Sequence, residues 1–172
     1  MSNTSGKKVL MILASMNFRD PEFFEPKKVL EKAGIEVLTA SSAPISKGAE
    51  GAKIEVDLLL DQVNPENFDA VAFIGGPGTS EYFKNPIAHG IAKKTLSSGK
   101  LLCAICIAPV ILANAGVLKD KKATVFSSGQ SDLEKNGATY TGTDIEIDGN
   151  IITATGPKVA KEFGEAIVKA LK

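Results

Sequence analysis

Short, continuous apolar runs alternate with amphipathic segments along most of the chain. A run without polar alternation is typical of a strand buried on both faces, and the amphipathic segments between the runs indicate helices. The predicted strands cover residues 9–14, 35–40, 69–74, 100–105 and 123–126. The predicted helices cover residues 21–33, 87–97, 107–115 and 158–171. This alternation predicts an α/β fold in which a mainly parallel sheet carries helices on both faces.

Two segments depart from this alternation. Residues 41–56 are rich in Gly, Ser and Ala, and we expect a loop that contains a short hairpin. Residues 145–153 surround Asp148-Gly149, a strong turn signal, and predict a second hairpin. No linker, repeat or low-complexity tract is visible, so residues 1–172 are expected to form one domain with a flexible N-terminus over residues 1–6.

The segment around the two cysteines, Cys103 and Cys106, allows two interpretations. A helix that begins at Cys103, as in a Cys-x-x-Cys redox pair, would place Pro109 in its interior at a cost of about 3 kcal/mol. If instead the strand continues through Ile105 and the helix begins at Ile107, Pro109 falls in the first turn, where its missing N–H costs nothing. The second interpretation predicts that Cys106 lies on a sharp turn between strand and helix.

That turn has the features of a nucleophile elbow. Small residues lie two positions before and two positions after Cys106, namely Ala104 and Ala108, which lets strand and helix pass closely. A thiol at a helix N-terminus is expected to have a lowered pKa and to form the nucleophilic thiolate. The alternative is an inert core cysteine, and that is the role we predict for Cys103, inside the apolar strand.

Other candidate groups follow neighbouring strands. Ligand sites of open parallel sheets lie beyond the carboxyl ends of the strands, where we place Glu22, the glycines of residues 75–78 and Cys106. The N–H groups of Gly76 and Ile107 are the predicted oxyanion donors if a tetrahedral intermediate forms at Cys106.

The first helix carries its own signals. Asp20 is the predicted N-cap and Pro21 the first helical residue. Pro26 cannot donate a hydrogen bond to the Glu22 carbonyl. It either kinks the helix and aims Glu22 at the strand ends, or divides the segment into two short helices.

Composition excludes several partners. Lys and Arg number 20, as do Asp and Glu, so the net charge is zero and the chain lacks the basic field that nucleic acid or anionic lipid requires. Arg19 is the only arginine, so bidentate phosphate or carboxylate clamps are nearly absent. The apolar run at residues 9–14 is too short for a membrane span or signal-peptide core, and two cysteines without a secretion signal favour a cytoplasmic location.

Neither a metal nor a cofactor is expected. One histidine, His89, and two cysteines in one strand and turn do not supply a usual metal-ligand set. Residues 75–79 follow a strand and are rich in glycine, but they lack the Gly-Lys-Ser/Thr ending of a phosphate-binding loop.

Four of these segments, in chain order, are shared with a known family: Asp-Pro-Glu-Phe-Phe-Glu-Pro at 20–26, the Gly-Gly of 69–78, Ala-Ile-Cys-Ile-Ala-Pro at 104–109, and residues 151–157. With them the sequence resembles the ThiJ/PfpI superfamily, which includes intracellular protease I and is related in fold to class I glutamine amidotransferases. The resemblance implies a flavodoxin-like three-layer sandwich with the elbow after a central strand. It also implies a reactive Cys106, a Glu22 that is often protonated and hydrogen-bonds to it, and a homodimer or higher homo-oligomer.

Three departures from the family pattern narrow the expected function. Ile107 replaces the histidine of the peptidase branch, Phe126 occupies the position of a histidine in the glyoxalase-linked branch, and His89 lies elsewhere. We therefore expect Cys106, with Glu22, to act on small reactive carbonyls in a glyoxalase-, deglycase- or hydrolase-like reaction rather than on peptides. The alternatives are a redox-sensing or chaperone-like stress protein that uses oxidation of Cys106, and an inactive relative retained as an interaction module.

Overall fold

The computed structural model describes residues 3–172. Residues 1 and 2, part of the predicted flexible N-terminus, lie outside the described residues. Within the described part of that segment, Thr4 is buried and its hydroxyl donates a hydrogen bond to the carbonyl oxygen of Ala33.

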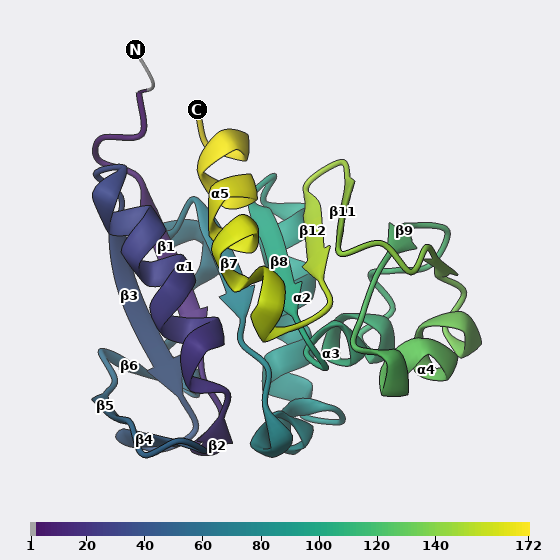
Figure 1. The fold of residues 1–172 in the computed structure, drawn as a ribbon, viewed down its shortest axis with the longest axis horizontal. Helices are drawn as coiled ribbons and strands as arrows, with labels where there is room; N and C mark the ends of the chain where they lie inside the picture. Colours follow the sequence, from purple (N-terminus) through teal and green to yellow (C-terminus); the bar gives the residue numbers. More distant parts are fainter. Residues whose placement is uncertain (1–2) are drawn as a thin grey trace.

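A seven-stranded sheet forms the centre of the molecule, in the order β11-β12-β8-β7-β1-β3-β6 (Figure 1). Every neighbouring pair is parallel except β11 and β12, which form the predicted hairpin at one edge. The strands are β1 (Lys8–Ile12), β3 (Glu36–Ser41), β6 (Leu58–Leu59), β7 (Ala70–Phe73), β8 (Leu101–Ile105), β11 (Ile145–Asp148) and β12 (Ile151–Ala154). The predicted α/β fold with a mainly parallel sheet is confirmed.

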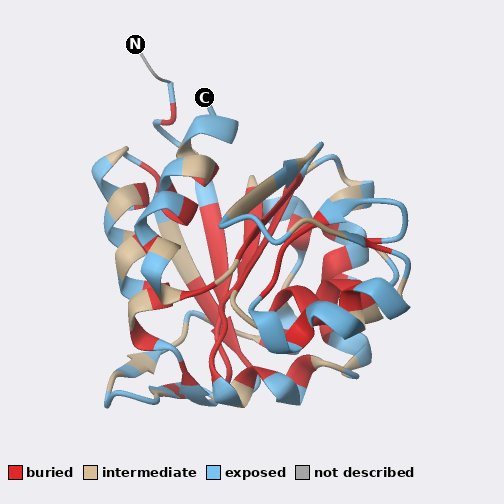
Figure 2. Cartoon of the chain, turned by 45° about the vertical axis from the view of Figure 1, so that its right-hand side comes forward, coloured by how far each residue is buried: buried red, intermediate tan, exposed pale blue. Residues whose placement is uncertain are grey.

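Two helical layers cover the sheet, because alternate strand residues feed two separate cores. Val9 and Met11 of β1 pack with α1 (Asp20–Lys32) and α5 (Ala160–Ala170), which lie side by side in Figure 1. Leu10 and Ile12 pack on the opposite face with α2 (Pro86–Ser97) and α3 (Pro109–Asn114). Figure 2 shows the central strands as the most continuously buried part of the chain. Burial on both faces explains why the strands read as unbroken apolar runs.

Smaller elements complete the fold. A three-stranded sheet, in the order β2-β4-β5, contains the hairpin predicted within residues 41–56. Its strands are β2 (Met16–Phe18), β4 (Ile45–Gly48) and β5 (Lys53–Glu55). The others are β9 (Lys122–Ala123), β10 (Thr139–Tyr140), α4 (Gln130–Lys135) and five 3-10 turns, η1 (Leu60–Gln62), η2 (Pro65–Asn67), η3 (Pro77–Tyr82), η4 (Ser127–Gly129) and η5 (Pro157–Val159). Within residues 3–172, no helix combines the length and the hydrophobicity needed to cross a membrane.

The predicted strand over residues 123–126 is wrong, because β9 ends at Ala123. The backbone beyond it is satisfied in other ways. The Thr124 N–H donates to the Thr153 hydroxyl, and the Phe126 N–H donates to the Cys106 carbonyl at 2.8 Å. This detour brings Phe126 next to the cysteine turn.

The start of α1 also differs from the prediction. Arg19, not Asp20, is the N-cap residue, and its side chain makes no capping hydrogen bond. The Asp20 carboxylate instead accepts hydrogen bonds from the N–H groups of Glu50 and Ala52, which fix the distant 49–52 turn. The helix continues through Pro26 to Lys32 as one element, so the division into two short helices does not occur.

The α1–α5 contact depends on Gly164. A Cβ added there would lie 2.9 Å from the Cα of Pro26 and 3.1 Å from the Cβ of Val29. Backbone cannot move as cheaply as a flexible side chain, so Gly164 sets the distance between the two helices that cover this face of the sheet.

Gly164→Ala should therefore lower the free energy of unfolding by about 1–3 kcal/mol through overpacking, measured by urea denaturation. Gly90→Ala is the matched control, because Gly90 lies within α2 and a Cβ there would meet nothing within 4 Å. The control should gain about 0.5–1 kcal/mol from helix propensity. Equal gains in both variants would contradict the close α1–α5 contact.

Candidate active site

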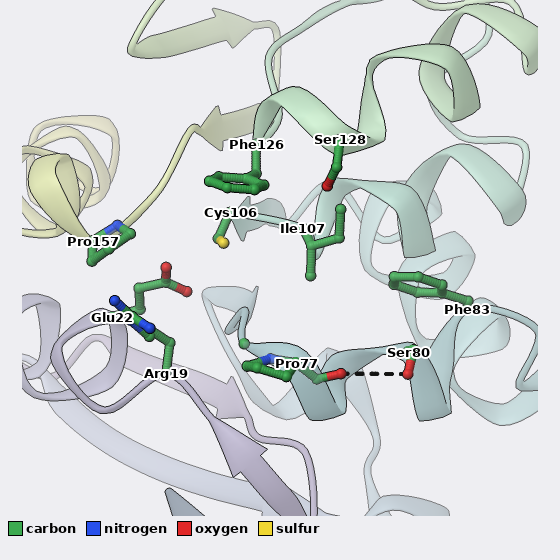
Figure 3. Close-up of a pocket in the computed structure, with 11 residues that line it drawn as sticks. Arg19, Glu22, Pro77, Ser80, Phe83, Cys106, Ile107, Phe126, Ser128 and Pro157 are labelled. Atoms are coloured by element: carbon green, nitrogen blue, oxygen red, sulfur yellow. Dashed lines mark hydrogen bonds between the residues drawn. The ribbon is translucent and has the colours of Figure 1, made fainter. Parts of the chain in front are cut away.

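A pocket of about 380 Å³ lies beyond the carboxyl ends of the central strands. Its walls come from the segments that follow β1, β7, β8 and β12 and from the 126–128 segment. The lining residues are Arg19, Glu22, Gly76, Pro77, Ser80, Phe83, Cys106, Ile107, Phe126, Ser128 and Pro157 (Figure 3). All four sequence-predicted site residues, Cys106, Glu22, Gly76 and Ile107, are among them.

Cys106 lies directly after β8, in a left-handed backbone conformation with φ = 64°. For a non-glycine residue this conformation costs about 1–2 kcal/mol, so neighbouring contacts must hold it. The Cys106 N–H donates to the Ala154 carbonyl, and the Cys106 carbonyl accepts from Phe126, both at 2.8 Å. Cys106 is half-buried at the pocket wall, whereas Cys103 is completely buried inside β8.

Glu22 lies in the first turn of α1 and is completely buried. Within residues 3–172, neither carboxyl oxygen has a hydrogen-bond partner at good geometry. Burial raises the pKa of Glu22 to about 7, although the nearby Cys106 thiol, the Gly75 N–H and the Arg19 charge each lower this pKa. A substantial fraction of this carboxyl is therefore neutral near pH 7.

Gly75 is the point at which Glu22 and Cys106 converge. A Cβ added there would lie 2.5 Å from Oε1 of Glu22 and 2.6 Å from Cβ of Cys106. No side chain larger than hydrogen fits without displacing one of them. The missing side chain at Gly75 thus provides the space in which carboxyl and thiol approach each other.

The pKa of the Cys106 thiol differs from the expectation of a lowered value. Burial raises this pKa well above its usual range, and the Glu22 carboxylate raises it further, whereas the N–H groups of Ile107 and Gly76 lower it. The sequence could not reveal the burial, and α3 begins only at Pro109 and has six residues, so its dipole is small. Formation of a thiolate at neutral pH would therefore require a base, and Glu22 is a titratable group close enough to influence the pKa of this thiol.

The sequence prediction missed several lining residues. Arg19, at the N-cap of α1, places its guanidinium beside Glu22 in Figure 3, and its Nε lies 3.8 Å from Oε2 of Glu50. Phe83 and Ser128 also line the pocket. The single arginine of the chain was a signal for Arg19, but no local pattern marked the other two.

His89 is not among the pocket-lining residues. Its Nε2 lies 2.8 Å from the Phe83 carbonyl oxygen, which also accepts a hydrogen bond from Asn114. His89 therefore has a structural role behind the pocket wall. In the described part of the chain, no group of three or more His, Cys, Asp or Glu side chains is placed to hold a metal ion.

Comparison with known proteins agrees with this geometry. Residues 7–170 match the model of the DJ-1/PfpI family. The chain belongs to the DJ-1/PfpI family. It is 35% identical to a deglycase of Pyrococcus horikoshii, with 96% of this chain and 99% of the relative covered. It is 31% identical to a glutathione-independent glyoxalase of Caenorhabditis elegans, over 96% of this chain and 89% of the relative.

A solved structure resembles this chain in both fold and sequence. The crystal structure of a ThiJ/PfpI domain protein from Brachyspira murdochii superimposes with a TM-score of 0.94 at 34% identity, over 96% of this chain and 98% of that one. The DJ-1/PfpI family therefore accounts for both the sequence motifs and the whole fold, as the resemblance to ThiJ/PfpI proteins predicted.

The raised pKa of Glu22 predicts a pH dependence of stability. Between the unfolded value of 4.5 and the folded value of about 7, the folded chain binds more protons than the unfolded chain. The contribution of Glu22 to the free energy of unfolding is therefore present at low pH and falls as the pH rises through this window, by at most about 1.4 kcal/mol per pH unit.

Glu22→Gln is neutral at every pH and should lack this fall. Urea denaturation across the window should show the variant gaining stability relative to the wild type as the pH increases. Parallel pH profiles for the two proteins would contradict a buried Glu22 with a raised pKa.

Proposed function

We propose that the protein is a cysteine-dependent enzyme that acts on small reactive carbonyls, with Cys106 as nucleophile and Glu22 as the group that moves the proton. The observation that carries this proposal is the convergence of a half-buried thiol and a buried carboxyl with a pKa of about 7 on Gly75, at the wall of one pocket. A general base is most effective when its pKa lies near the working pH.

The reaction begins when the Glu22–Cys106 pair loses one proton, near pH 7. In the reactive form the carboxyl holds the remaining proton and the sulfur attacks as a thiolate. Because the two groups are coupled, the pKa near 7 describes the loss of one proton from the pair rather than from one atom. A sulfur–carbon bond forms as the carbonyl π electrons move to oxygen. The N–H groups of Gly76 and Ile107, which lower the pKa of the Cys106 thiol, stabilise the developing oxyanion, and Glu22 returns the proton to it.

The absence of a histidine beside the thiol favours aldehydes over peptides as substrates. Cleavage of an amide requires protonation of the leaving amine, and Ile107 occupies the position next to Cys106. The pocket volume of about 380 Å³ is in the range of small-molecule sites. The names deglycase and glutathione-independent glyoxalase among the relatives support the same substrate class.

Methylglyoxal consumption tests this proposal. The wild type should consume methylglyoxal, and Cys106→Ala should lose at least about a hundredfold, the lower range for loss of a catalytic group. Cys103→Ala is the matched control, three residues earlier in β8, and should retain the activity. The rate should rise with pH through about 7, because deprotonation of the pair produces the reactive form, and Glu22→Gln should remove this inflection.

Equal consumption by the wild type and Cys106→Ala would refute the role of the thiol. An unchanged pH inflection in Glu22→Gln would refute the role of the carboxyl.

The different burial of the two thiols favours oxidant sensing as a second function. Cys106 is accessible from the pocket, whereas Cys103 is completely buried. One peroxide transfers an oxygen atom to the Cys106 sulfur and leaves as water, which gives the sulfenic acid, and a second peroxide converts this to the sulfinic acid in the same way. A neutral Glu22 can donate a hydrogen bond to the resulting sulfinate.

Mild peroxide should therefore add oxygen at Cys106 before Cys103, as measured by mass spectrometry of proteolytic peptides. Glu22→Gln should change the balance between reversible sulfenic and stable sulfinic acid. Oxidation of Cys103 first would contradict the accessibility of Cys106 in this pocket.

A further inference from the structure

Arg19 gives the pocket one end that can bind an anion. It is the only arginine in the sequence, and among the described residues that line the pocket it is the only cationic one. The Arg19 N–H donates to the Gly75 carbonyl at 2.8 Å, and Gly76 packs against the same backbone. The backbone at residues 75 and 76, next to which Glu22 and Cys106 converge, therefore also fixes the position of the Arg19 backbone from which the guanidinium extends.

The opposite end of the pocket carries no charge and is mainly apolar, with the side chains of Ser80 and Ser128 as its polar groups. In Figure 3, Arg19 and Phe83 lie on opposite sides of Cys106, Ile107 lies between the thiol and Phe83, and the Phe126 ring lies next to the thiol. A ligand whose reacting carbon is at Cys106 thus meets a positive charge in one direction and an uncharged, mainly apolar wall in the other.

The guanidinium retains donors for a ligand. Its ion pair with Glu50 uses Nε at 3.8 Å, and both side chains are about half exposed, so the pair is weak. Glu22 is the other carboxyl near Arg19, and it is substantially neutral near pH 7. A planar guanidinium presents five N–H donors in a fork that matches a carboxylate.

We propose that Arg19 binds the carboxylate of the substrate, so that the preferred substrates are small aldehydes that also carry a carboxylate. This inference rests on the proposed reaction of Cys106 with carbonyls and names its substrate class. Arg19 holds the anion while the thiol adds to the aldehyde carbon. The sulfur–carbon bond forms, the carbonyl electron pair moves to oxygen, and the proton held by the Glu22–Cys106 pair completes a thiohemiacetal with no change of oxidation state.

Two alkylating agents of almost identical shape test the charge preference. Iodoacetate carries a carboxylate where iodoacetamide carries a neutral amide, and both transfer their carbon to the Cys106 sulfur with loss of iodide. The measured quantity is the ratio of the two alkylation rates at Cys106, from mass spectrometry of the labelled peptide. Arg19→Gln should lower the iodoacetate-to-iodoacetamide ratio about fivefold, the size expected for a half-exposed charge pair.

Three matched variants separate local from general charge effects. Lys94→Gln removes a positive charge that is paired with Glu66 outside this pocket, and should leave the ratio unchanged. Glu50→Gln removes the competing carboxylate and should raise the ratio. Arg19→Lys keeps the charge without the fork and should give an intermediate ratio. An equal ratio in the wild type and Arg19→Gln, or an equal fall in Lys94→Gln, would overturn the proposal.

Glyoxylate and methylglyoxal provide a second test that does not need a reactive thiol. Both are aldehydes with the same number of non-hydrogen atoms, and a carboxylate in one replaces the acetyl group of the other. Binding of glyoxylate to Cys106→Ala, measured by NMR titration, should weaken about fivefold when Arg19→Gln is added, whereas methylglyoxal should bind equally to both. Equal glyoxylate binding with and without Arg19→Gln would refute the role of Arg19 even if Cys106 were reactive. If neither reagent alkylated Cys106 in the wild type, only the function proposed for Cys106 would be refuted.

Discussion

The absence of a side chain at Gly75 is the constraint on which the site depends. Glu22 and Cys106 come from different segments, the first turn of α1 and the end of β8, and both reach the space that a Cβ at Gly75 would fill. The carboxyl is completely buried, and that burial, rather than a charged neighbour, raises its pKa to about 7. Close packing around one glycine thus produces a carboxyl with a pKa near neutral, which supports the proton-transfer role that we propose for Glu22.

The parallel sheet explains why these groups meet. The segments after β1, β7, β8 and β12 all leave the same edge of the sheet, so residues far apart in the sequence line one pocket. The left-handed turn at Cys106 then presents the thiol at that edge, and two backbone hydrogen bonds hold it there. The side chains of Ile107 and Phe83 make the wall on the side away from Arg19 mainly apolar. Arg19 adds the opposing charge, and this contrast is the basis of the specificity that we propose.

Sequence patterns were sufficient where a single local rule determined the structure. Apolar runs predicted the central strands because burial on both faces removes polar alternation. Pro109 predicted the turn at Cys106 because a proline is favoured in the first turn of a helix, where its missing N–H costs nothing. Local rules were insufficient where a distant partner decided the outcome. Asp20 has the residue type of an N-cap, yet its carboxylate binds the N–H groups of Glu50 and Ala52.

The candidate site shows the same division. Its residues could be placed at one edge of the sheet from the order of the strands. The direction in which the pKa of the Cys106 thiol shifts could not be predicted, because burial is a property of the assembled core. The 123–126 segment was predicted as a strand, whereas its N–H groups bind the Thr153 hydroxyl and the Cys106 carbonyl. The part played by Gly75 required the positions of two side chains that the sequence does not give.

Infrared difference spectroscopy of the Glu22 carboxyl tests the central claim most directly. The wild type should show the C=O stretching band of a protonated carboxylic acid that disappears with a midpoint near pH 7, that is missing in Glu22→Gln, and that shifts when Cys106 is alkylated. A Glu22 band that titrates near the ordinary value of 4.5, or one that alkylation of Cys106 leaves unmoved, would contradict a neutral carboxyl beside the thiol.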